Sequence, residues 1–176
     1  MRTLTGKLCR LEPQVAAHAP EMFAVLSDSA IYEFEGVPPP SIEALAAGYK
    51  RKESRLSPDG SEGWLNWVVR RHDGAATGYV QATLMPNGLA YVGYEFSSRF
   101  WRQGIATDSL NAMLAELAHA YGVSSVVALL KAKNYRSLGL LRSLGFREAA
   151  PEVAASHNHE ADELVFVRSL GPENGV

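Results

Sequence analysis

The sequence predicts a mixed α/β domain, because a β-rich region is followed by segments with helical periodicity. Within residues 64–96, runs rich in β-branched and aromatic residues are separated by Asp73-Gly74 and Asn87-Gly88. Such pairs are strong signals for hairpin turns. Beyond this region, the spacing of apolar residues changes from a period of about 2 to one of about 3.6, which indicates helices.

Length and composition exclude several classes of protein. With 176 residues, 47% of them hydrophobic, the chain is long enough for one core. We therefore expect a single domain over residues 1–170 and a flexible tail over 171–176. A net charge of −2 lacks the basic excess of a nucleic-acid-binding surface, and no apolar run approaches the ~18 residues of a membrane span. The lone Cys9 excludes an internal disulfide and fits a reducing cytoplasm.

Two helices are expected before the β-rich region. Residues 13–28 place apolar residues at roughly helical spacing, and Pro13 suits a first helical turn. The segment 32–40 is expected to be a loop, because its three consecutive prolines remove backbone donors and fix φ. Ser41 is a favourable N-cap residue, so a second helix is expected over residues 41–54.

The remaining elements alternate between strands and helices. The β-rich region predicts a three-stranded antiparallel meander. Gly122 suits the end of the next helix, which carries apolar residues on one face. After the meander we expect a helix over residues 106–121, a strand over 123–130, a helix over 134–145, and strands over 146–153 and 162–170.

The segment FWRQGIATDSL, residues 100–110, places a glycine where a strand gives way to a helix. A helix that begins near Ala106 has unpaired N–H groups and a partial positive charge in its first turn. Gly104 lets a ligand approach the backbone closely, so this segment is a candidate anion site. It lacks the further residues of a Walker A loop and of the dinucleotide-binding GxGxxG motif. The alternative is an ordinary loop.

A second segment, NYRSLGLLRSLGF over residues 134–146, begins with two polar residues that are one helical turn apart. Asn134 and Ser137 lie at the start of a helix, so both side chains can face one ligand. The alternative is that Asn134 simply caps the helix.

Taken together, the two segments resemble the GNAT superfamily of N-acetyltransferases, which move an acetyl group from acetyl-CoA to an amine. The family signature is Arg/Gln-x-x-Gly-x-Gly/Ala, and Gly104, Ile105 and Ala106 match its second half. The resemblance is closest to the branch that acetylates the N-termini of ribosomal proteins. The residues that match this branch are Trp101, Gly104, Ala106, Thr107, Asn134, Ser137, Leu141, Leu144, Gly145 and Phe146.

This resemblance implies a fold and an activity. The fold is a mixed, mostly antiparallel central sheet of about six to seven strands, flanked by about four helices, with the fourth and fifth strands splayed. The activity is acetyl transfer to a primary amine, which is a protein N-terminus, an antibiotic, a polyamine or another small amine. The alternative is a non-catalytic acyl-CoA-binding sensor or interaction domain with the same fold. We expect no metal, and a monomer or a homodimer.

The resemblance also implies which residues bind the cosubstrate, acetyl-CoA. Phe96 would offer backbone hydrogen bonds to the pantetheine arm between the splayed strands. Asn134 would hold the pantetheine or a water, and Ser137 would donate a hydrogen bond to the leaving sulfur. The CoA pyrophosphate would lie over the backbone N–H groups of Arg102, Gln103, Gly104, Ile105, Ala106 and Thr107.

Four positions depart from the family pattern. Trp101 replaces the Arg/Gln of the signature, and Arg102 occupies the first glycine of the branch, which adds a cation near the phosphates. Gly139 stands where the branch often has a basic residue near the cofactor. Leu141 occupies the place at which many other members carry a tyrosine general acid, so that role would pass to Ser137 or to water.

The general base has several candidates. Glu95 lies on the fourth strand beside the cleft, although strand alternation could turn it away from the substrate. Glu33 and Glu35 lie on the loop after the first helix, which in the family borders the acceptor pocket; each is alternatively a solvated surface carboxylate. Water relaying the proton is a further alternative, and a pKa raised by partial burial would mark the base. His157 and His159 are expected in a polar turn rather than a metal site.

Overall fold

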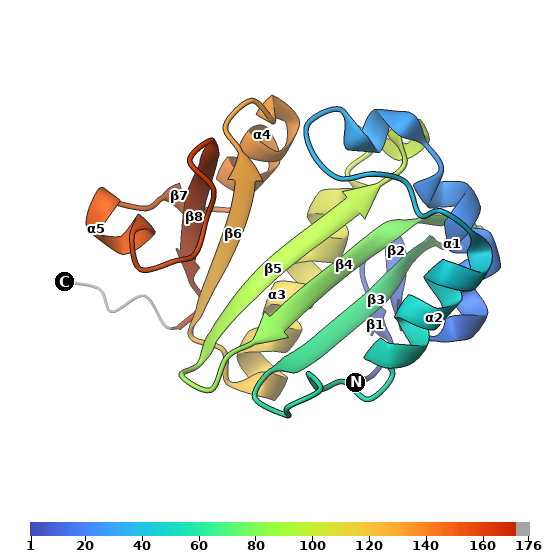
Figure 1. The fold of residues 1–176 in the computed structure, drawn as a ribbon, viewed down its shortest axis with the longest axis horizontal. Coiled ribbons are helices and arrows are strands. Elements are labelled where there is room, and N and C mark those ends of the chain that lie inside the picture. The colour runs from blue at the N-terminus through green and yellow to red at the C-terminus, as the bar shows by residue number, and fades with distance from the viewer. Residues whose placement is uncertain (172–176) are drawn as a thin grey trace.

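The computed structural model describes residues 1–171 and contains one eight-stranded sheet (Figure 1). The strands lie in the order β1-β2-β3-β4-β5-β6-β8-β7, and every neighbouring pair is antiparallel except β5 and β6. The strands are Leu4–Thr5 (β1), Cys9–Pro13 (β2), Gly63–Arg71 (β3), Ala76–Leu84 (β4), Leu89–Phe96 (β5), Ser125–Lys131 (β6), Arg147–Glu148 (β7) and Glu163–Ser169 (β8). The α-helices are Ala19–Leu26 (α1), Ile42–Lys52 (α2), Ile105–Tyr121 (α3), Tyr135–Ser143 (α4) and Pro151–Ala154 (α5).

The antiparallel meander predicted over residues 64–96 is confirmed by β3, β4 and β5. β4 pairs with β3 on one side and with β5 on the other. Gly74 and Gly88 have φ angles of 96° and 77°, a conformation that favours glycine in tight turns.

The predicted helix over residues 13–28 is wrong at its start. Pro13 ends β2, in which buried Cys9 and Leu11 alternate with exposed Arg10, and β2 pairs with β3. The helix α1 begins only at Ala19. The two N-terminal strands lie outside the sequence prediction, because alternation over so few residues is a weak signal.

The predicted strand over residues 146–153 is wrong over most of its length. β7 covers only its second and third residues, and Pro151 begins the short helix α5. Proline suits a first helical turn and lacks the N–H group that a sheet would need. The sheet has eight strands where about six to seven are expected, and the described residues contain five α-helices where about four are expected.

The other three predicted helices and the strand at residues 123–130 are confirmed as α2, α3, α4 and β6. The Ser41 hydroxyl accepts a hydrogen bond from Ala44 N–H at 3.1 Å and caps α2. Gly122 ends α3 with a left-handed φ of 65°. The tail predicted over residues 171–176 lies outside the described residues except for its first position.

β5 and β6 are paired only at one end. Their register joins residues 89–91 of β5 to residues 125–127 of β6, whereas both strands continue well beyond these pairs. Figure 1 shows the two strands diverging toward α4. The splay that the resemblance implies between the fourth and fifth strands of the family is therefore confirmed. In this structure the two strands are β5 and β6. We call this opening the β5–β6 splay.

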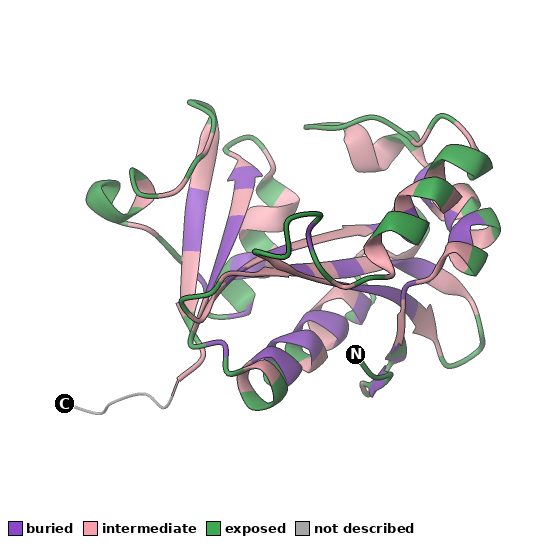
Figure 2. Cartoon of the chain, turned by 60° about the horizontal axis from the view of Figure 1, so that its bottom comes forward, coloured by how far each residue is buried: buried purple, intermediate pink, exposed green. Residues whose placement is uncertain are grey.

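The main hydrophobic core lies between the sheet and α3, and buried residues run along this helix (Figure 2). A second, smaller cluster packs α1 and α2 against the opposite face of the sheet. Val68 belongs to this second cluster, while its neighbours Trp67 and Val69 belong to the main core, as strand alternation requires. No helix within residues 1–171 is both long and apolar enough to cross a membrane.

Candidate functional site

The predicted anion loop lies between the end of β5 and the start of α3. The first backbone hydrogen bond of α3 joins Asp108 N–H to the Gly104 carbonyl at 2.9 Å. The N–H groups of Ile105, Ala106 and Thr107 precede this bond, so they have no partner within the helix. The amino end of α3 therefore presents three donors in the place where the sequence predicts an anion.

Two residues of this loop have left-handed backbone conformations. The φ angle is 79° at Gly104 and 58° at Arg102. A Cβ atom on residue 104 would lie 3.2 Å from Leu8 Cδ1, so the loop packs closely against the turn between β1 and β2. Arg102 adopts this left-handed backbone at a cost of roughly 1–2 kcal/mol, because it carries a side chain.

Asp108 attaches the first turn of α3 to the turn between β1 and β2. Its carboxylate accepts hydrogen bonds from Lys7 N–H at 3.0 Å and from Leu8 N–H at 2.8 Å. Burial acts to raise the pKa of Asp108, but these hydrogen bonds outweigh it and the pKa lies below its usual value. The ionised carboxylate therefore holds α3 in a fixed position relative to the first two strands.

Trp101 closes the end of β5. Its indole N–H donates a hydrogen bond to the Phe96 carbonyl at 2.7 Å. Ser97 N–H donates to the Thr77 carbonyl of β4 at 3.0 Å, so strand alternation turns the N–H and carbonyl of Phe96 toward the β5–β6 splay. Because the carbonyl of Phe96 is already engaged, its N–H is the group that remains available toward this opening.

The first turn of α4 faces β5 across the splay. The Asn134 side-chain oxygen accepts a hydrogen bond from Ser137 N–H at 3.1 Å, so Asn134 caps α4, and this cap does not use its amide N–H donors. The Ser137 side chain lies close enough to the Tyr94 hydroxyl of β5 to act against the raised pKa of this phenol, which places the serine at the splay. Leu141 is 1% exposed and lies in the main core, so it has no access to a ligand.

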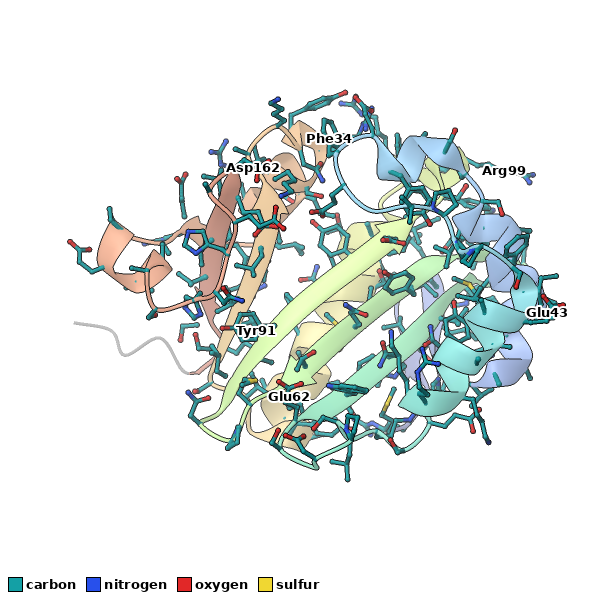
Figure 3. The ribbon with its side chains drawn as sticks, viewed as in Figure 1. Phe34, Glu43, Glu62, Tyr91, Arg99 and Asp162 are labelled. Carbon is teal, nitrogen blue, oxygen red and sulfur yellow. The ribbon has the colours of Figure 1, made fainter. Side chains whose placement is uncertain are left out.

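Arg136 joins α4 to the loop that follows α1. Its guanidinium lies 2.7 Å from the Glu33 carboxylate and 4.4 Å above the ring of Trp101. The rings of Phe34 and Tyr135 meet edge to face at 5.7 Å, and Phe34 lies beside the start of α4 (Figure 3). We call these five residues the Arg136 cluster. Because Glu33 is held in an ion pair, it is a weaker candidate for the general base than Glu95.

Glu95 lies on the face of β5 opposite to Tyr94 and Phe96, because successive side chains alternate along a strand. It is paired in register with Tyr79 of β4. Burial raises the pKa of Glu95, and the hydrogen bond from Tyr79 offsets only part of this effect. A raised pKa is the property expected of a general base, and among the three carboxylates considered Glu95 and Glu35 have it.

Other carboxylates gather on the same side of the sheet. Burial raises the pKa of Glu35, and the negative charge of Glu163 adds to this effect. Glu35 in turn helps to raise the pKa of Glu95. Lys131, at the end of β6, binds Asp162 at 2.8 Å (Figure 3). Glu35 is thus the carboxylate whose charge acts on Glu95, and the ammonium group of Lys52 acts in the opposite direction.

The predicted polar turn at residues 157–160 connects α5 to β8. His157 Nδ1 lies 2.8 Å from the Tyr91 hydroxyl of β5, and the two rings meet edge to face. Within residues 1–171, no group of three or more His, Cys, Asp or Glu side chains is arranged to hold a metal ion. His157 thus packs the last connection against the sheet.

The segment that contains this fold and this site matches a known protein family. A family model described as an acetyltransferase (GNAT) domain matches residues 9–147. This range contains the anion loop, both walls of the β5–β6 splay and Glu95. The chain belongs to the GNAT acetyltransferase family. GNAT enzymes use acetyl-CoA as acetyl donor. No curated protein matches the sequence.

Solved GNAT structures share the fold over nearly the whole chain. A ribosomal-protein-S5-alanine acetyltransferase from Vibrio fischeri is 15% identical, with a TM-score of 0.74 over 98% of this chain and 99% of that one. RimL, a ribosomal L7/L12 α-N-protein acetyltransferase in complex with coenzyme A, is 16% identical. Its TM-score is 0.75, over 93% of this chain and 94% of that one. A chimera of the Vibrio cholerae spermidine N-acetyltransferase SpeG and hSSAT is 15% identical, with a TM-score of 0.74 over 93% and 96%. At these identities, the likeness concerns the fold.

Two residues of this GNAT site, Tyr94 and Arg136, are not identified from the sequence. Tyr94 lies two residues before Phe96, so strand alternation places both on one face; this spacing is the signal that could have identified it. Arg136 gives no such signal, because its partners Glu33 and Trp101 come from segments far apart in the chain.

Proposed function

We propose that this GNAT enzyme transfers the acetyl group of acetyl-CoA to a primary amine by direct attack of the amine on the thioester. The observation that carries the proposal is the position of the β5–β6 splay beside the amino end of α3. An anion-binding helix end and an opening between two strands meet there, with Glu95 on one face of β5 and Ser137 across the opening.

The loop residues fit the diphosphate of CoA. The N–H groups of Ile105, Ala106 and Thr107 lack helix partners, and the helix end adds a partial positive charge that favours an anion. Gly104 keeps the backbone free of a side chain at this point, and Arg102 adds a full positive charge.

The pantetheine arm then has polar partners on both sides of the splay. On β5, the N–H of Phe96 is turned toward the opening. On α4, the amide N–H groups of Asn134 can donate to the arm or to a water beside it. An extended chain held between these groups brings its thioester to the level of Ser137.

Three groups of the chain act on the reacting atoms in this proposal. Glu95 removes a proton from the acceptor ammonium, directly or through one water, so that the amine can attack the thioester carbonyl. Backbone N–H groups at the splay stabilise the negative charge that develops on the carbonyl oxygen. As the carbon–sulfur bond breaks, Ser137 donates a hydrogen bond to the thiolate of CoA.

The acceptor that fits this site best is a cationic amine. Glu95 and Glu35 face the same side of the sheet, and further carboxylates lie around Lys131 at the end of β6. Negative charge at the mouth of a site raises the local concentration of a cation. The solved relatives named above include acetyltransferases for ribosomal proteins and for spermidine, so the fold accommodates amines of very different size.

A thiol-release assay with acetyl-CoA tests this proposal directly. The panel of acceptors contains polyamines, aminoglycosides and peptides with free N-termini, and each is compared with a reaction that lacks an acceptor. We expect acceptor-dependent release of CoA thiol, with the largest kcat/KM for a cationic amine, and acetylation of that amine in the mass spectrum.

Binding is measured in parallel by the thermal shift with acetyl-CoA and with CoA. Binding without turnover across the whole panel would contradict the transfer reaction and favour a non-catalytic acyl-CoA sensor. If neither acetyl-CoA nor CoA at millimolar concentration shifts the unfolding temperature, both functions are excluded.

A further inference from the structure

The Tyr94 hydroxyl is a buried polar group without a hydrogen-bond partner among the described residues. Its ring packs partly against the main core, 6.3 Å from the ring of Phe96. Burying a hydroxyl without a partner costs roughly 1–3 kcal/mol, and most buried polar side-chain atoms in proteins are paired. The Tyr94 hydroxyl is therefore expected to gain a hydrogen bond when a ligand binds, either to the ligand or to a side chain that changes its conformation.

Ser137 carries that side chain. Tyr94 lies on the part of β5 that continues past its last pair with β6, and Ser137 lies in the first turn of α4, on the other side of the splay. The serine side chain acts on the phenol as a hydrogen-bonding neighbour, yet no bond of normal geometry joins them. The cap between Asn134 and Ser137 N–H fixes the backbone of the serine. The rotations of its side chain and of its hydroxyl are left to decide where its proton points.

We infer that Tyr94 is a positioning residue for the acetyl transfer: once acetyl-CoA is bound, its hydroxyl donates a hydrogen bond to the Ser137 oxygen, so that the Ser137 proton points at the thioester sulfur. This inference rests on the proposed function of the same site. The phenol and the serine then form one chain of two hydroxyls that ends at the sulfur.

The electron and proton balance of this step is simple. When the carbon–sulfur bond breaks, its electron pair moves to sulfur, and the hydrogen bond from Ser137 stabilises the thiolate. Tyr94 keeps its own proton and polarises the serine hydroxyl through the chain. The proton that finally neutralises the thiolate is the one that the acceptor ammonium has lost, returned through the base or through water.

Two features of the structure suit Tyr94 to this role. Burial raises the pKa of Tyr94 to about 12, so the phenol stays protonated and remains a donor throughout the neutral range. Leu141, at the position where many family members have a tyrosine, is buried in the main core and offers no hydroxyl. In this chain the phenol comes from β5, the opposite wall of the splay.

The test is the variant Tyr94→Phe, which removes one oxygen and keeps the ring in the core. With the best acceptor of the thiol-release assay, we expect kcat to fall on the order of tenfold, the loss of one hydrogen bond that acts in the transition state. The KM for acetyl-CoA should stay within about twofold of the wild type. The unfolding temperature should not fall, because the lost hydroxyl has no partner in the free protein.

A double-mutant cycle with Ser137→Ala separates a positioning role from a structural one. If Tyr94 acts only through Ser137, adding Tyr94→Phe to Ser137→Ala should cause no further loss of kcat. The control is Tyr121→Phe, which alters another tyrosine packed against the same core but at the far end of α3. This control should leave kcat unchanged.

Wild-type kcat in Tyr94→Phe would overturn the inference while leaving the transfer reaction in place. Losses that multiply in the double mutant would also overturn it, since they would show that the phenol acts independently of Ser137. The absence of thiol release by the wild-type protein with every acceptor would instead remove the proposed function, and this inference with it.

Discussion

Glu95 is the residue on which the proposed chemistry depends most. A carboxyl group takes a proton from the acceptor only when it is ionised, and burial raises the pKa of Glu95 above the ordinary value of 4.5. We expect Glu95→Gln to lower kcat/KM on the order of a hundredfold, the usual contribution of a general base. The acid limb of the wild-type pH profile, in which activity falls as pH drops through the raised pKa, should disappear. Steady-state thiol release across the pH range measures both effects.

The same substitution changes stability with a defined sign. Between 4.5 and the raised pKa of Glu95, the folded protein binds more protons than the unfolded chain, so stability falls as pH rises through this window. Glu95→Gln should therefore unfold at a higher temperature than the wild type at neutral pH, and the difference should vanish below pH 4.5. Glu148→Gln, at an exposed carboxylate of β7, is the control. Full activity of Glu95→Gln at every pH would rule out the base.

Sequence reasoning at the residue scale succeeds where the cause is local. The left-handed Gly104 and the caps at Ser41 and Asn134 follow from turn and helix chemistry within a few residues. The ion pair of Glu33 and the burial of Glu95 do not, because both depend on segments that meet only in the folded protein.

At the scale of elements, α3 offers a pair of matched positions. Gly104 before the helix and Gly122 after it both have left-handed φ, 79° and 65°. An alanine at either position is expected to lower the free energy of unfolding by roughly 1–2 kcal/mol, because of the left-handed backbone. Only Gly104→Ala should also weaken CoA binding, since its methyl group would meet Leu8 at 3.2 Å and shift the N–H groups of the loop. Chemical denaturation and calorimetric titration with CoA measure the two effects.

The control Gly122→Ala carries the same kind of strain without the crowding, because no atom lies within 4 Å of the added carbon. It should bind CoA as the wild type does. Equal loss of CoA affinity in both variants would mean that general destabilisation, rather than the geometry of the loop, governs binding. Unchanged affinity in a folded Gly104→Ala variant would argue against the loop as the phosphate site.

The elements themselves were predictable where their signals are long. The meander and the helices α2, α3 and α4 each extend over enough residues for periodicity and turn residues to agree. β1 and β2 were missed because their alternation is short, and Pro13 was assigned to a helix although it ends a strand. The prediction of a strand over residues 146–153 is wrong because the apolar residues of this segment precede a proline that starts the helix α5.

At the scale of the whole molecule, the β5–β6 splay divides the sheet. One part carries β1 to β5, with α3 on one face and α1 and α2 on the other, and the main core continues from this part onto β6 and β8. The other part carries β6, β8 and β7. The Arg136 cluster connects α4 to the loop after α1 across this division, so it joins the two parts of the molecule.

The overall fold was predictable from two short motifs at a fixed spacing, because a family resemblance carries the order of elements with it. The tertiary links across the splay were not predictable, because neither Arg136 nor Tyr94 belongs to those motifs. Residues of this kind are recognised only when the opposing walls are seen together.

The central claim is that CoA binds between the β5–β6 splay and the amino end of α3. Amide hydrogen exchange of the whole chain, measured with and without saturating CoA, tests it most directly. We predict slower exchange of the amides at residues 102–107 and at the end of β5, with no change around the surface hollow lined by Arg2, Glu116 and Tyr121. Unchanged exchange at residues 102–107 in the presence of bound CoA would contradict the account.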